Sequence, residues 1–94
     1  MKIHRHLMGV LALAATGVGS ISVASAQQQY CQQLWVERNS YYKDAGYCFK
    51  TARAISYFGN DGCMYYNEAR IPLPPGIRAR IAEITSLERR SGCN

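Results

Sequence analysis

The sequence predicts a mainly α fold: a small three-helix domain that is stabilised by disulfides and has irregular loops between its helices. Apolar residues recur at spacings of three and four in two stretches, residues 31–45 and 75–90, which is the period of an amphipathic helix. Glycines, prolines and polar turn residues separate the helical stretches. All four cysteines follow residue 26, and an even count is typical of small exported domains that depend on disulfides.

The start of the chain, residues 1–26, has the pattern of a signal peptide. Two basic residues precede a mostly apolar run, and Ala-Ser-Ala at positions 24–26 fits the small-x-small rule for cleavage. We expect cleavage before Gln27, which leaves residues 27–94 as one domain of 68 residues. An uncleaved membrane anchor is the alternative, because an apolar run of about 18 residues is near the lower limit for spanning a bilayer.

The composition of residues 27–94 excludes several classes of function. His4 and His6 both belong to the signal segment, so the domain lacks the commonest general base and metal ligand. We therefore expect no catalytic residue and no enzyme. The cysteines include no Cys-x-x-Cys pair, which argues against zinc, and we expect no other metal or cofactor. Nine basic and six acidic side chains give little support to nucleic-acid binding.

The first two predicted helices have recognisable ends. Residues 31–45 form the first, and Gly46 suits the left-handed residue that closes a helix. Thr51 can cap the N-terminus of a short second helix within residues 51–60, which Gly59 stops. The residues expected to form an aromatic core around these helices are Trp35, Tyr42, Phe49, Tyr57 and Phe58.

The third predicted helix follows an irregular aromatic stretch. Three prolines between positions 72 and 75 keep that stretch extended and outside any helix interior. The helix covers residues 75–90, and two late arginines complement the C-terminal end of its dipole. Its narrow apolar stripe consists of Ile77, Ile81, Ile84 and Leu87.

The stretch LWVERNSYYKDAGYCF, from Leu34 to Phe49, resembles the core motif of the YARHG domain, a small extracytoplasmic bacterial module. The matching residues are Leu34, Arg38, Asn39, Tyr42, Gly46, Tyr47 and Phe49, together with the aromatic pair Tyr57 and Phe58. Lys43, Asp44 and Ala45 stand where the family has Ala-Arg-His, so any activity of that arginine or histidine is absent. The resemblance implies an exported domain, in the periplasm or secreted, with a role at the cell envelope.

Four cysteines allow three disulfide pairings. Cys48 and Cys63 flank the short second helix, which favours a bond between them. Cys31, at the start of the first helix, would then meet Cys93, after the last helix. The other two pairings stay open from the sequence alone.

Four residues are candidates for binding. Arg38 lies on the apolar face of the first helix, where bracing of the core edge through helix-end carbonyls or a carboxylate competes with anion or carbohydrate binding. Tyr65 and Tyr66 lie beside the proline-rich loop and are surface candidates, because tyrosine offers broad contact area with a polar tip. Arg78 belongs to a basic cluster that would attract anionic polymers, or else is part of a solvated helix face.

Together these features predict an exported binding or interaction module that acts at the bacterial cell envelope. Its partner would be a cell-wall glycan or another envelope protein. The alternative is a structural or inhibitory partner of another exported protein. We expect a monomer that associates with the membrane only through its signal segment.

Overall fold

The computed structural model describes residues 22–94, so the expected signal segment lies almost entirely outside the described residues. Its elements are α2 (Val23–Asp44), α3 (Ala52–Phe58), the short 3-10 helix η1 (Glu68–Arg70) and α4 (Pro75–Arg90). Residues 22–94 contain no strand. The predicted mainly α fold with three α-helices is therefore confirmed. No helix in this part of the chain is both long enough and apolar enough to cross a bilayer.

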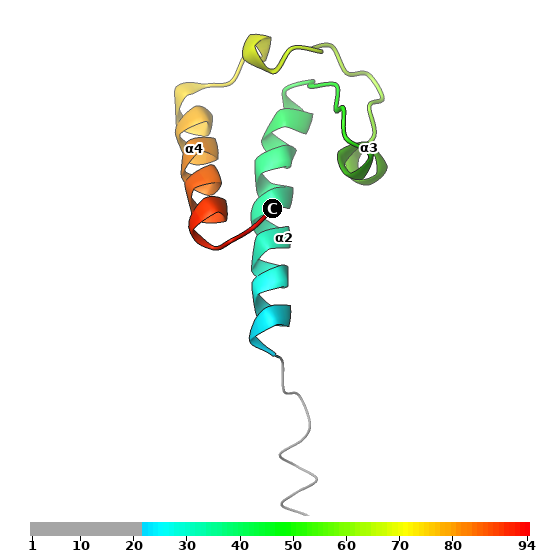
Figure 1. Cartoon of the computed structure of the whole chain (residues 1–94). Helices are drawn as coiled ribbons and strands as arrows, with labels where there is room; N and C mark the ends of the chain where they lie inside the picture. The colour runs from blue at the N-terminus through cyan, green and yellow to red at the C-terminus, as the bar shows by residue number, and fades with distance from the viewer. Residues whose placement is uncertain (1–21) are drawn as a thin grey trace, which may run out of the picture.

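The longest helix, α2, is the axis of the fold (Figure 1). α4 packs beside it and runs in the opposite direction, and α3 lies on the other side of α2. The N-terminal turns of α2 extend beyond both neighbours, and residues 22–30 are exposed. The part of α2 that is packed on both sides is thus its C-terminal half.

α2 begins eight residues before the predicted start at residue 31, which corrects the expected boundary. The Ser22 side chain caps the helix by accepting a hydrogen bond from the N–H of Ser25. Glutamines then continue the helix because they are good helix formers, although they have no apolar face to bury. The other end, Asp44, falls within one residue of the expected end. Periodicity missed the first two turns because those turns pack against little.

The core of the fold is mainly aliphatic. Its buried apolar residues are Leu34, Cys48, Phe49, Ala54, Ile71, Ile81 and Ile84. The stripe predicted for α4 lies against α2, with its two central isoleucines buried. Branched aliphatic side chains from α4 and the preceding loop therefore fill the space next to α2.

The predicted aromatic core is wrong for Tyr57, which is 56% exposed, and only Phe49 of the predicted set is buried. The other three predicted aromatics are half-buried. The rings of the five predicted residues and of Tyr47 contact one another in a continuous series around the edge of the core. The order is Trp35, Tyr57, Phe58, Phe49, Tyr47 and Tyr42. Because α3 has only seven residues and buries only Ala54, it leaves its last aromatic side chains at the rim.

The irregular segment after α3 is attached to the turn after α2. Met64 and Tyr65 both donate their N–H to the carbonyl oxygen of Gly46, at 2.7 and 3.0 Å, and Cys48 donates to the Tyr65 carbonyl oxygen at 2.8 Å. The Cys48–Cys63 disulfide links the same two segments, with 5.1 Å between its Cα atoms. These bonds hold the chain that leads to α4 over the C-terminal end of α2.

Candidate binding groove

A groove of about 520 Å³ lies where the N-terminal half of α2, α3 and the turn after α4 meet. Besides the Cys31–Cys93 disulfide, the side chains that give it chemical character are Gln27, Gln28, Gln32, Trp35, Arg53, Glu88 and Asn94. We call this set the groove. It combines four carboxamides, one indole, one guanidinium and one carboxylate.

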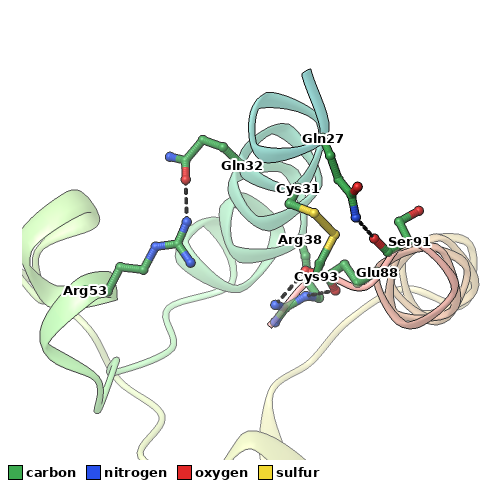
Figure 2. Close-up of a disulfide and its surroundings, with 8 residues drawn as sticks. All are labelled: Gln27, Cys31, Gln32, Arg38, Arg53, Glu88, Ser91 and Cys93. Carbon is green, nitrogen blue, oxygen red and sulfur yellow. Dashed lines mark hydrogen bonds and ion pairs between the residues drawn. A yellow bond between two sulfur atoms is a disulfide. The ribbon is translucent and has the colours of Figure 1, made fainter. Parts of the chain in front are cut away.

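The turn after α4 forms one wall of the groove, and a disulfide holds it to α2. Cys31 and Cys93 are 62 residues apart, and their Cα atoms lie 5.5 Å from each other. One turn earlier on α2, the Gln27 carboxamide donates to the carbonyl oxygen of Ser91 (Figure 2). The structure has the two disulfides that the sequence favours, Cys48–Cys63 and Cys31–Cys93. Both links fix the chain after α4 beside the glutamine-rich part of α2.

Arg53, at the start of α3, forms the opposite side of the groove. Its guanidinium carbon lies 3.8 Å from the centroid of the Trp35 ring, a cation–π contact. Its Nη2 donates to Oε1 of Gln32 (Figure 2). Within residues 22–94 no carboxylate lies within ion-pair distance of Arg53. Arg53 is therefore a positioned cation whose charge no acidic side chain of the described chain balances.

Glu88, the carboxylate of the groove, is already paired. Arg38 Nε and Nη2 donate to its two oxygens at 2.8 and 3.0 Å, a bidentate arrangement between α2 and α4. The Arg38 and Glu88 side chains are only 26% and 13% exposed. Arg38 thus braces the two helices through a carboxylate, the first of the two roles considered from the sequence, and its charge is neutralised there.

Arg78 lies away from the groove, at the start of α4. It donates to the carbonyl oxygens of Leu73 and Ile71, both at 3.1 Å, and so holds the proline-rich loop against the helix. These bonds give Arg78 a structural contact at the opposite end of α4 from Glu88.

The two tyrosine candidates have different environments. Tyr65 is half-buried, and its ring lies close to Gly46, where a Cβ atom would come within 3.4 Å of it. Tyr66 is 73% exposed. Neither residue lines the groove. The four binding candidates chosen from the sequence are therefore not brought together into one site.

The sequence carries one signal for the groove, in the spacing of residues along α2. Gln28, Gln32 and Trp35 follow one another at spacings of four and three, so they share a face of α2. Arg53 carries no such signal, because its position depends on how α3 packs across α2. The groove is a tertiary feature of which only one wall is readable from helical spacing.

A second polar cluster connects α2 to α4. It consists of Glu37 and Tyr41 on α2 and Arg80 on α4. Arg80 donates to both carboxylate oxygens of Glu37 at 2.7 and 2.8 Å, and the Tyr41 hydroxyl donates to the same carboxylate at 2.7 Å. The Arg80 bond, followed by the Tyr41 bond, lowers the pKa of Glu37 to about 2. The bond to Glu37 also raises the pKa of the Tyr41 hydroxyl. This carboxylate is held ionised, which suits an ion pair between helices.

Comparison with known proteins gives one positive result. The YARHG domain family model matches residues 11–89. No curated protein and no solved structure is matched by the chain. Two disulfides in such a domain are typical of an exported, extracytoplasmic protein. Because the match covers most of the sequence, the chain belongs to the YARHG domain family.

Proposed function

We propose that this protein is an exported binding module, not an enzyme, that acts at the bacterial cell envelope with cell-wall glycan as its ligand. The groove is the observation that supports this most directly. It presents a positioned guanidinium and several carboxamides between α2, α3 and the turn after α4. The proposal places the protein in the periplasm or outside the cell, as a monomer.

The chemistry of the groove suits a sugar. A carboxamide offers two N–H donors and an acceptor oxygen, which matches hydroxyl and acetamido groups. Gln28 and Gln32 lie one helical turn apart on α2 and are exposed. The Cys31–Cys93 disulfide and the Arg53–Trp35 contact fix two walls before any ligand arrives. A preformed site reduces the entropy lost on binding.

The carboxylates support binding over hydrolysis. Glycoside hydrolysis commonly requires two carboxyl groups on either side of the scissile bond. Glu88 is the acidic side chain among the groove residues, and both of its oxygens accept hydrogen bonds from Arg38. Because Arg38 occupies both oxygens of this carboxylate, Glu88 is not free to contact a glycosidic oxygen.

The test is cosedimentation of the oxidised, exported protein with isolated peptidoglycan sacculi over a salt series. We expect saturable binding that persists at salt concentrations where exposed charges are screened. A double variant, Gln28→Ala with Gln32→Ala, should weaken binding. The matched control, Gln29→Ala with Gln33→Ala, changes two exposed glutamines that do not line the groove and should bind as the wild type does. Absence of sedimentation, or binding lost at moderate salt, would contradict the proposal.

A second function, as a structural or inhibitory partner of another exported protein, is supported by a different observation. Six large apolar side chains are exposed in residues 22–94, among them Tyr57, Met64 and Tyr66, at 56%, 67% and 73%. Exposed aromatic residues are common anchors at protein interfaces. This function predicts that one envelope protein copurifies with the chain in stoichiometric amount, and that Tyr66→Ser abolishes its recovery while sacculus binding is unaffected.

A further inference from the structure

We propose that the groove recognises an acidic sugar, with the carboxylate of the sugar paired to the Arg53 guanidinium. The inference rests on the proposed function, because it names the ligand chemistry of the same groove. It follows from the charge of the groove, from the way Arg53 is held, and from the carboxamides next to it.

The charge of the groove fits a single negative charge. Its charged lining residues are Arg53 and Glu88, and Glu88 is neutralised by its bidentate pair with Arg38. Arg53 remains as one unbalanced positive charge in residues 22–94. A monoanionic carboxylate balances it. A polyphosphate or sulfated polymer would bring several negative charges to a groove whose lining side chains offer one cation outside an ion pair, with a carboxylate nearby.

The guanidinium is held in a way that leaves its donors for a ligand. The Trp35 ring covers one face of the guanidinium, and all five N–H donors of arginine lie in the plane, at the edge. Among the described residues Arg53 makes one side-chain hydrogen bond, from Nη2 to Gln32. The remaining N–H groups include the pairs that bind a carboxylate in the bidentate geometry. Stacking on Trp35 also reduces the rotamer freedom that binding would otherwise remove.

The surrounding carboxamides favour a sugar over a simple carboxylate. Gln32 uses its oxygen to accept from Arg53, which orients its NH₂ group as a donor next to the guanidinium. Gln28 lies one turn away on the same face of α2. A sugar that carries a carboxylate places hydroxyl or acetamido groups within the reach of such neighbours. The arrangement therefore pairs one charge contact with adjacent neutral hydrogen bonds.

The test is an NMR titration of the oxidised, exported protein with small probes. N-acetylmuramic acid carries a lactyl carboxylate that N-acetylglucosamine lacks, so the two sugars form a matched pair. Glucuronic acid serves as an acidic sugar of another kind, and lactate as a carboxylate without a sugar ring. We expect both acidic sugars to shift the Trp35 indole and Arg53 side-chain resonances, at affinities about tenfold or more above those of N-acetylglucosamine and lactate.

Variants give the second arm of the test. Arg53→Gln should abolish the preference for the acidic sugar, and Arg53→Lys should restore only part of it because lysine cannot bind a carboxylate bidentately. Arg89→Gln removes the same charge from an exposed residue outside the groove and should leave the preference unchanged. Equal binding of N-acetylglucosamine, equal binding of lactate, or an unchanged preference in Arg53→Gln would overturn the inference. Sacculus binding by the wild type without any preference for the acidic sugars would overturn the inference while leaving the proposed function in place.

Discussion

The side-chain amide of Asn60 bonds to both backbone groups of Phe49. Asn60 Oδ1 accepts from the Phe49 N–H at 2.8 Å, and Asn60 Nδ2 donates to the Phe49 carbonyl oxygen at 3.0 Å. Phe49 is buried in an extended segment that has no neighbouring strand at this point, so its backbone groups need another partner. Asn60, which follows α3, supplies both bonds and thereby closes the loop around that helix.

Asn60→Ala is expected to destabilise the fold by about 2 kcal/mol. The substitution removes two hydrogen bonds and leaves a part-buried N–H and a part-buried carbonyl without partners. Asn67→Ala is the matched control, because the Asn67 side chain makes one exposed bond, to the N–H of Ala69, and its loss should cost less than about 1 kcal/mol. Urea denaturation of both variants measures the difference, and equal midpoints would contradict the prediction.

Stability is expected to fall in acid because of Glu37. Its pKa in the folded state is about 2, against about 4.5 for the free group, so the ion pair with Arg80 contributes fully above pH 4.5. That contribution is lost as the pH falls through the interval from about 4.5 to about 2, since the unfolded state binds the proton more readily.

Thermal melts of the wild type and Glu37→Gln between pH 6 and pH 2 measure this effect. The two melting temperatures should differ most near neutral pH and converge toward pH 2. Glu83→Gln removes a 61% exposed partner of the same arginine and should keep the wild-type profile. A constant difference between wild type and Glu37→Gln across the range would exclude the assignment.

The Arg38–Glu88 pair is expected to behave as one energetic unit. Arg38→Met or Glu88→Gln should each cost about 2 kcal/mol, because each leaves a partly buried polar partner unpaired. The double variant should cost about as much as either single variant, which is the sign of a direct interaction in a double-mutant cycle. Additive losses would show that the two side chains stabilise the fold independently.

Gly46→Ala is expected to destabilise more than Gly62→Ala. Both glycines have a positive φ, 93° and 72°, which a residue with a Cβ adopts at a cost of about 1–2 kcal/mol. A Cβ at Gly46 would also lie 3.3 Å from the Met64 side chain and 3.4 Å from the Tyr65 ring, whereas Gly62 faces open space. Thermal melts of the two variants measure the difference, because Gly62→Ala introduces backbone strain alone and Gly46→Ala adds crowding. An equal loss of melting temperature would contradict the role given to Met64 and Tyr65.

Reduction is expected to unfold the protein at ambient temperature. The chain-entropy estimate is about 3 kcal/mol for a loop of some 15 residues and about 4 kcal/mol for a loop of some 60. These values approach the whole stability of a small domain. A circular dichroism melt with and without reductant measures the effect. The paired variants Cys48→Ser/Cys63→Ser and Cys31→Ser/Cys93→Ser separate the two bonds, and an unchanged transition in reductant would refute the expectation.

Local chemistry predicted much of the fold, because helix ends depend on neighbouring residues. Thr51 caps α3 by accepting from the N–H of Ala54, as expected. The isoleucine stripe of α4 likewise follows from spacing. Apolar periodicity did not predict the first turns of α2, because these turns consist largely of exposed glutamines and have no apolar face. The exposure of Tyr57 depends on how the short helix α3, which buries only Ala54, packs on the fold, and spacing along the chain does not specify that packing.

The candidate site was less predictable for a related reason. Trp35 and Arg53 come from different helices, and their contact depends on the angle at which α3 crosses α2. Arg38 looked available for a ligand because its acidic partner, Glu88, lies 50 residues later. The sequence shows which side chains can bind anions, and tertiary packing determines which of them is already neutralised.

The way the two disulfides are nested has a consequence for maturation. An exported chain delivers its cysteines in order, so Cys31 and Cys48 meet an oxidant first, although neither is the other's native partner. Pairing by order of arrival would give two wrong bonds. The native pattern requires either that Cys31 waits as a free thiol until Cys93 has crossed, or that an early bond is exchanged by a thiolate. The groove wall after α4 is therefore the last part of the binding surface to be secured, and a host that oxidises thiols quickly but exchanges disulfides poorly should accumulate the protein in a mispaired form.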